Sequence, residues 1–198
     1  MLDPGVATLV EVSAAVATRD GRRLRSALQR AIGQDAAVDE ILLQSHLFVG
    51  FPDALNAIAL WREVSATPAP ADDDAPETWS ARGARVCATV YGSNYERLRE
   101  NVRALHPAMD GWMVAGGYGR VIGRAGLDLA TRELCIAALL AVWNVPRQLH
   151  SHLRGALNAG AAAAEVTAAL EIACGMISEE RAATVRDLWR RVRDGISA

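Results

Sequence analysis

Two of the four histidines of this 198-residue chain flank a single serine in the segment NVPRQLHSHLRGALNAG, residues 144–160. Histidine exchanges protons near neutral pH and also binds metal ions, so His150 and His152 are compatible with acid/base chemistry or with a metal site. On a helix, however, residues two apart point about 200° away from each other, and two such rings cannot reach one ion. The spacing therefore argues against a metal-binding helical protein.

The apolar residues of this segment define the buried face of the predicted helix: Leu149, Leu153, Ala156, Leu157 and Gly160. His152 lies beside this face, three residues after Leu149, whereas His150 falls on the polar face with Arg147 and Arg154. We therefore expect His152 to be largely buried and His150 to be substantially exposed. An inward histidine is either a core residue with satisfied hydrogen bonds or an acid/base group, and the helix alone does not decide between them.

A partner for His152 is available in the preceding predicted helix, which Asp128 caps and which spans residues 129–143. Glu133 stands near the start of that helix and shares a face with apolar residues that must be buried. A buried carboxylate needs compensation, and a histidine on the next antiparallel helix gives it. The alternative is that Glu133 only interacts favourably with the N-terminus of its helix.

A third histidine stands in the segment LQSHLFVGFP, residues 43–52. His46 lies near the apolar stripe of a predicted helix, two residues before Phe48. Periodicity leaves open whether His46 packs in the core or has a function. Pro52 interrupts this helix, and we expect a kink or a restart there.

The elements that must position these residues are predicted to be helices. Apolar residues make up 51% of the chain and aromatic residues only 5%, so alanine and leucine carry the apolar mass, which favours packed helices over strands. We expect an all-α fold class. The Gly-rich segment 111–128 is expected to be irregular. The predicted helices span approximately residues 9–17, 22–32, 36–64, 95–105, 129–143 and 146–160, with two more before the C-terminus.

One break divides the chain. The segment SATPAPADDDAPET, residues 65–78, combines proline, alanine and acidic residues without apolar periodicity, which predicts an exposed linker. It separates an N-terminal segment, residues 1–64, from a C-terminal segment, residues 79–198.

The two segments share a pattern. SALQRAIG followed by VDEILLQSHLFVGFP resembles GALNAG followed by AEVTAALEIACGMIS, and each pair comes after an apolar helix and a short break. We therefore predict two copies of a three-helix unit, of which the first is degenerate. The two copies should interlock into one compact unit, because neither copy alone has much core.

Charge and composition argue against several classes of function. A net charge of −2 offers no attraction to nucleic acid or to an anionic membrane. The chain has no apolar run of about 20 residues, and no basic residues precede its first apolar stretch, so we expect neither a membrane span nor a signal peptide. Three widely spaced cysteines, Cys87, Cys135 and Cys174, predict reduced core thiols in a cytoplasmic protein rather than disulfides or a zinc site.

Residues 118–160, YGRVIGRAGLDLATRELCIAALLAVWNVPRQLHSHLRGALNAG, resemble the carboxymuconolactone decarboxylase family, relatives of the alkylhydroperoxidase AhpD. EILLQSHLFVGFPDALNA resembles the third helix of the family, and VYGSNYERLRENVRALHP resembles the segment that precedes the core in decarboxylase-type members. The resemblance covers most of the chain. It implies an AhpD-like helical fold and assembly as a homo-oligomer.

The peroxidase branch of that family has the pattern E-x11-C-x2-C-x3-H. When the glutamate of the pattern is aligned with Glu133, His152 occupies the histidine position, but Val145 and Gln148 occupy the two cysteine positions. Peroxide reduction needs one thiolate that attacks and a second thiol that resolves the product, and valine and glutamine do neither. The sequence therefore predicts that the protein is not a thiol peroxidase.

The decarboxylase-like branch implies a lyase or isomerase that uses no cofactor and no metal and acts on a small carboxylated or lactone metabolite. The resemblance implies Glu133 and His152 as the catalytic pair, because loss of CO2 leaves a dienolate that must be protonated at carbon. An arginine would hold the substrate carboxylate as a bidentate pair, and Arg124 and Arg132 are the candidates.

The two predicted copies complement each other. Glu133 and His152 occur only in the second copy, and the Gly-Phe-Pro motif at residues 50–52 occurs only in the first. We therefore predict a divided site, in which the third helix of the first copy forms the opposite wall and contacts substrate through His46 and Phe48. The alternative is a non-catalytic binding or stress-related protein that kept the fold.

Overall fold

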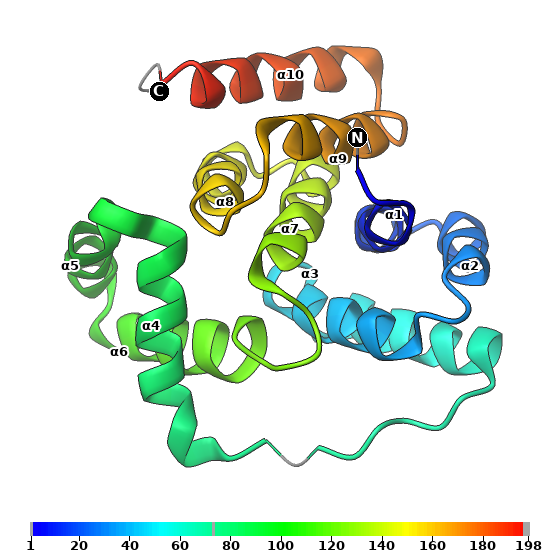
Figure 1. Cartoon of the computed structure of the whole chain (residues 1–198), viewed down its shortest axis with the longest axis horizontal. Coiled ribbons are helices and arrows are strands. Elements are labelled where there is room, and N and C mark those ends of the chain that lie inside the picture. Colours follow the sequence, from blue (N-terminus) through cyan, green and yellow to red (C-terminus); the bar gives the residue numbers. More distant parts are fainter. Residues whose placement is uncertain (1, 73, 196–198) are drawn as a thin grey trace.

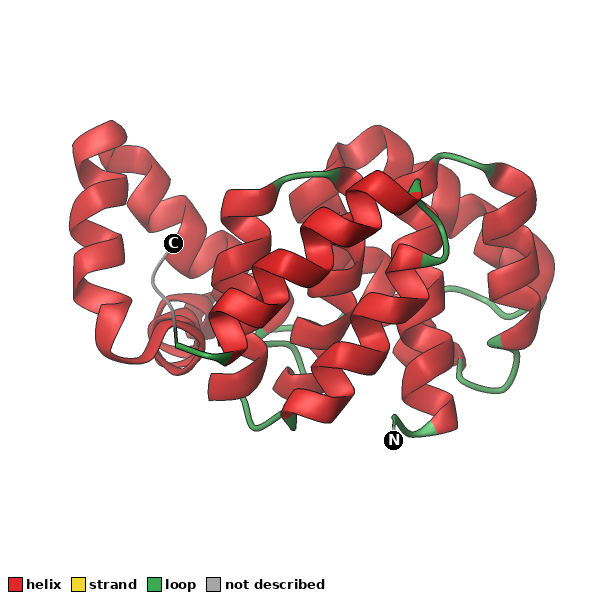
Figure 2. Cartoon of the chain, turned by 90° about the horizontal axis from the view of Figure 1, so that it is seen from above, coloured by secondary structure: helices red, strands yellow, loops and turns green. Residues whose placement is uncertain are grey.

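The computed structural model describes residues 2–72 and 74–195, and all regular secondary structure within these ranges is helical (Figure 1). The predicted all-α, AhpD-like fold class is confirmed, since helices alternate with loops and turns (Figure 2). None of the helices in the described ranges is long and apolar enough to cross a membrane. In chain order the elements are α1 (Pro4–Thr18), α2 (Gly21–Arg30), α3 (Asp35–Ser65), η1 (Pro76–Thr78), α4 (Trp79–Tyr91), η2 (Gly92–Asn94), α5 (Tyr95–Leu105), α6 (Pro107–Gly111), η3 (Trp112–Ile122), α7 (Leu129–Trp143), α8 (Pro146–Asn158), α9 (Ala163–Cys174) and α10 (Glu179–Arg193).

Two apolar helices, α1 and α7, pack against each other near the centre of the molecule (Figure 1). Every residue of α7 from Thr131 to Val142 is buried. The buried Ser13 hydroxyl of α1 donates to the Cys135 carbonyl of α7 at 2.8 Å, which satisfies a polar group inside the core. Both α3 and α9 contact α1 as well as α7. Helices from both halves of the chain therefore share one core.

The long helix α3 breaks at Gly50, whose φ of 80° and ψ of 170° lie outside the helical region. The break predicted at Pro52 thus lies two residues earlier. Proline has no N–H to donate and its ring clashes with the carbonyl four residues back, so the helix opens in the turn before it. Glycine adopts the positive φ without strain. The break separates the half of α3 that carries His46 and Phe48 from the half that follows.

Two elements differ from the prediction. The sequence singled out no helix between the linker and residue 95, but α4 forms there, and the Gly-rich segment expected to be irregular contains the π-helix η3. The backbones of α4 and η3 are in direct contact at two glycines. A Cβ on Gly83 would overlap the Val114 carbonyl, and a Cβ on Gly119 would overlap the Trp79 carbonyl. Tertiary packing here overrides the low helix propensity of glycine.

Gly119→Ala is expected to destabilise the protein by at least about 2 kcal/mol, because the new methyl group meets rigid backbone. The matched control is Gly116→Ala in the same π-helix, where a Cβ would meet nothing within 4 Å and where we expect little change. Chemical unfolding followed by circular dichroism measures both variants. Equal stability of the two would contradict the close packing of α4 on η3.

Candidate functional site

Glu133 and His152 form a buried hydrogen bond between α7 and α8. His152 Nδ1 and Glu133 Oε2 are 2.8 Å apart, the Glu133 side chain is completely buried, and the His152 side chain is 7% exposed. Asp128 starts α7 by accepting a hydrogen bond from the Thr131 backbone, and Pro146 starts α8 after a short connection. A carboxylate only accepts hydrogen bonds, so Nδ1 carries the proton of this bond.

The Glu133 carboxylate is enclosed by α8 and α4. A Cβ on Gly155 of α8 would lie 2.6 Å from Glu133 Oε2 and 2.7 Å from Val90 of α4, so only glycine fits at this position. The other carboxylate oxygen, Oε1, is buried and has no hydrogen-bond partner among the described residues. Because an unpaired buried oxygen is costly, the bond to His152 is the main compensation for this carboxylate. Sequence reasoning did not single out Gly155, although a glycine inside a helical pattern is a recognised signal of close packing.

The His152 ring also contacts the first half of the chain. The Phe48 ring of α3 meets it edge to face, with ring centroids 5.5 Å apart and planes at 85°. This contact restricts the orientation of the histidine. The structure thus brings Glu133, His152 and Phe48 together within one chain.

His150 leaves the other side of α8, as the spacing requires. It is half-buried, however, where substantial exposure was expected, whereas His152 is 5% exposed as predicted. The cover comes from α4 and α5, which form a cleft with α8 that His150 lines. The sequence could not show this cover, because it did not place α4 and α5 beside α8.

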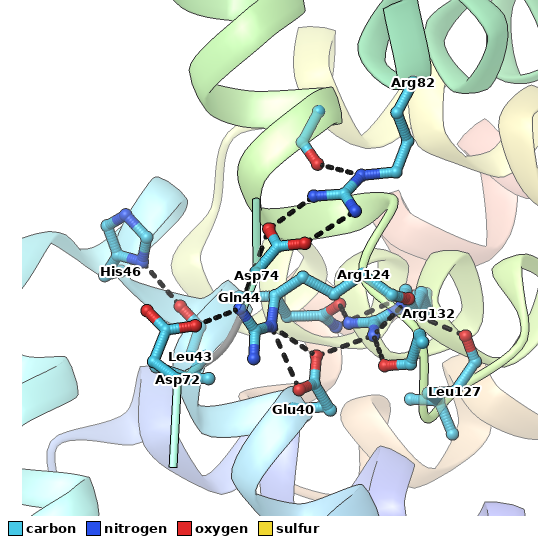
Figure 3. A network of polar contacts seen from close by, with 12 residues as sticks. Glu40, Leu43, Gln44, His46, Asp72, Asp74, Arg82, Arg124, Leu127 and Arg132 are labelled. Atoms are coloured by element: carbon cyan, nitrogen blue, oxygen red, sulfur yellow. Dashed lines mark hydrogen bonds and ion pairs between the residues drawn. The ribbon is translucent and has the colours of Figure 1, made fainter. Parts of the chain in front are cut away.

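A network of charged side chains links α3, the linker and the start of α7 (Figure 3). Arg132 is fully buried, and its Nη2 donates to Glu40 Oε2 at 2.7 Å. Arg124 donates from Nε to the same carboxylate at 3.1 Å and from Nη1 to Asp72 at 3.0 Å. Both guanidinium groups that the sequence nominates for a substrate carboxylate therefore already bind carboxylates of the protein.

His46 points away from Glu133 and His152. It stands two residues before Phe48 on α3, so the two side chains leave opposite sides of that helix. The His46 Nδ1 lies 2.5 Å from the Leu43 carbonyl oxygen, and its ring centroid is 5.0 Å from that of Phe51. A carbonyl only accepts hydrogen bonds, so Nδ1 of His46 is the donor in this contact.

His46 and Arg124 meet at a separate cavity of about 260 Å³ between α3, residues 69–72 and η3. His152 does not line this cavity. Of the four residues predicted to bind substrate, Phe48 contacts His152, His46 and Arg124 lie at the separate cavity, and Arg132 is buried between α3 and α7.

Cys87, Cys135 and Cys174 are all buried and free. Burial raises the pKa of the Cys87 thiol to about 12 and also raises the pKa of Cys135 and of Cys174. Such thiols hold little thiolate at neutral pH and are poor nucleophiles. Within residues 2–72 and 74–195, no group of three or more histidine, cysteine, aspartate or glutamate side chains is arranged to hold a metal ion.

Comparisons with known proteins agree with the resemblance drawn from the sequence. Residues 107–190 match the model of the carboxymuconolactone decarboxylase family. Over 149 residues the chain is 30% identical to Peroxisomal protein 2 of Schizosaccharomyces pombe, and the match covers 71% of this chain and 68% of that relative. The chain belongs to the carboxymuconolactone decarboxylase family. The part that matches the family model contains Glu133 and His152, while Phe48 lies before it, in α3.

The thiols are expected to be unreactive in the folded protein, because burial keeps them protonated. At pH 8 we expect no rapid reaction with a disulfide reagent such as dithionitrobenzoate, and reaction of all three cysteines once the protein is denatured. The absorbance of the released thiolate measures both states. One stoichiometric, fast-reacting thiol in the native protein would contradict the burial described above.

The Glu133–His152 bond predicts a coupled pair. His152→Leu alone is expected to destabilise the protein by about 3–5 kcal/mol, because it leaves the buried Glu133 carboxylate without its partner. The double variant Glu133→Leu/His152→Leu removes that carboxylate as well and should be more stable than His152→Leu. Chemical unfolding of His152→Leu, Glu133→Leu and the double variant measures the coupling free energy between the two side chains. Purely additive losses of stability would show that the two side chains act independently.

Proposed function

We propose that the protein is a carboxymuconolactone decarboxylase-like enzyme, a lyase or isomerase that uses Glu133 and His152 as a cofactor-free acid/base pair. Its substrate is a small carboxylated or lactone metabolite. The observation that supports this proposal is the 2.8 Å hydrogen bond between the histidine and a completely buried carboxylate, in the region that matches the family. Buried carboxylate–histidine pairs of this geometry are typical of general acid/base catalysis.

In this proposal Glu133 accepts the hydrogen bond from Nδ1, so Nε2 is the nitrogen that exchanges a proton with substrate. When the bond to the substrate carboxylate breaks, CO2 leaves and the electron pair stays behind as a dienolate. Protonated His152 gives its Nε2 proton to the dienolate carbon, and water restores that proton. Glu133 holds the ring through Nδ1 throughout, and the proton balance closes without a redox partner.

The substrate-binding residues divide according to their surroundings. Phe48 supplies an apolar wall, since it is the residue of α3 that lies against the His152 ring. Arg124 and Arg132 remain the candidates for the substrate carboxylate, on condition that the substrate competes with Glu40 for their N–H donors. His46 contacts a substrate only if that substrate extends to the separate cavity at Arg124.

The test is turnover of 4-carboxymuconolactone and of a panel of carboxylated lactones and β-keto acids, followed as CO2 release. His152→Gln keeps the approximate volume of the side chain but transfers no proton, and we expect a loss of at least about 100-fold in kcat. His106→Asn is the control, because it replaces an exposed histidine outside the site with another residue that caps α6. Undiminished kcat in a folded His152→Gln variant would remove His152 as the acid/base group.

A second candidate function is non-catalytic binding of a small molecule. The observation that favours it is the separate cavity of about 260 Å³, whose lining combines the polar side chains of His46 and Arg124 with the apolar side chains of Phe51 and Ile58. The same panel separates the two functions. Turnover supports the enzyme, whereas thermal stabilisation without turnover, lost in His46→Ala, supports the binding protein.

Assembly and location remain predictions. Exposed apolar side chains at Leu105, Met109 and Trp112, on consecutive elements, support a homo-oligomer, because apolar patches on a surface mark interfaces. A cytoplasmic location is the expectation from the cysteines. The name of the relative Peroxisomal protein 2 makes the peroxisome the alternative location to test.

A further inference from the structure

A cleft of about 340 Å³ is lined by residues of α5 and α8 and by the end of α4. Neither Glu133 nor His152 lines this cleft. It opens on the side of α8 that carries His150, which the proposed catalytic role of His152 does not use.

The two walls of the cleft repeat one pattern of polar residues. Each wall has a polar residue, an arginine three positions later and an asparagine four positions after that, a spacing that keeps the side chains on one face of a helix. The first wall presents Asn94, which caps α5, with Arg97 and Asn101 of α5, and the α8 wall presents Ser151, Arg154 and Asn158. Hydrogen-bond donors therefore converge on the cleft from both sides.

The lining of the cleft contains two arginines and one histidine but no carboxylate. Within the described part of the chain, the guanidinium groups of Arg97 and Arg154 have no ion pair, whereas Arg99 on the same helix as Arg97 pairs with Asp110. Burial, together with the positive charges of Arg154 and Arg191, lowers the pKa of His150. The cleft is thus a region of unbalanced positive charge.

The floor of the cleft is fixed by a contact between α4 and α8. Asn158 Nδ2 donates to the Val90 carbonyl at 2.9 Å. Two residues after Val90, Gly92 follows the end of α4 with a φ of 53°, and a Cβ at this position would lie 3.4 Å from Asn158 Nδ2. A floor that the hydrogen bond between Asn158 and Val90 already holds does not have to be ordered when a ligand binds, which lowers the free-energy cost of binding.

We propose that this cleft binds a small dianion, either a dicarboxylate or a phosphate, between Arg97 and Arg154. Guanidinium groups hold carboxylate and phosphate oxygens through pairs of N–H donors. Asn94 and Asn101 supply further donors. The volume of about 340 Å³ lies in the range of small-metabolite sites. Binding here requires neither Glu133 nor His152, so the inference does not rest on the proposed function.

Sodium phosphate and sodium succinate are the two probes, titrated into the full chain at constant ionic strength. The side-chain N–H signals of arginine and asparagine in NMR spectra report binding. We expect saturable binding with a Kd below about 5 mM for at least one probe, and the tighter probe identifies the source of the dianion. Acetate, a monoanion, should bind at least about tenfold more weakly, since it cannot engage both arginines fully.

Arg97→Gln and Arg154→Gln are each expected to weaken binding about tenfold or more, because each removes charge-assisted hydrogen bonds. Arg147→Gln is the matched control, since Arg147 is an exposed arginine on α8 that does not line the cleft. The inference is overturned if neither probe saturates, if acetate binds as tightly as the better probe, or if Arg147→Gln weakens binding as much as the two cleft variants.

Discussion

Burial of the Glu133 carboxylate is the constraint on which the rest of the site depends. The helix α7 is surrounded by protein on all sides, so the carboxylate loses its water and must be compensated by protein groups. His152 supplies one hydrogen bond, and Oε1 receives none from the described residues. Helix α8 can approach closely enough to supply that bond because Gly155 has no side chain to meet Glu133 Oε2. The proposed chemistry and the packing of α7 on α8 therefore depend on the same interaction.

Arg124 and Arg132 form a second polar cluster with Glu40 of α3. Glu40 accepts hydrogen bonds from Arg124 and Arg132, and so ties the segment before α7 to α3 (Figure 3). Since these guanidinium groups are neutralised by the protein, they serve the fold first. Arg97 and Arg154 line the cleft without a carboxylate partner among the described residues and are available to an external anion. The distribution of carboxylates thus separates arginines that hold the structure from arginines that are free to bind.

Helical periodicity in the sequence is enough to place His152 inward and to find α7, because both follow from the apolar face of a single helix. It could not find α4 or η3, since these depend on backbone contact at Gly83 and Gly119, which only the tertiary structure brings together. The pairing of Glu40 with Arg124 and Arg132 could not be predicted for the same reason, because the two arginines lie 84 and 92 residues further along the chain. The cover over His150 likewise comes from helices that the sequence did not place beside it.

The central claim is that Glu133 holds His152 through the Nδ1 atom of the ring. Long-range ¹H–¹⁵N NMR spectra of the histidine ring report which nitrogen carries a proton, a feature that heavy-atom positions alone only imply. We predict that His152 Nδ1 carries a proton at every pH at which the protein is folded, and that Glu133→Leu abolishes its hydrogen-bonded signal. A neutral His152 ring with its proton on Nε2 and none on Nδ1 would contradict the claim.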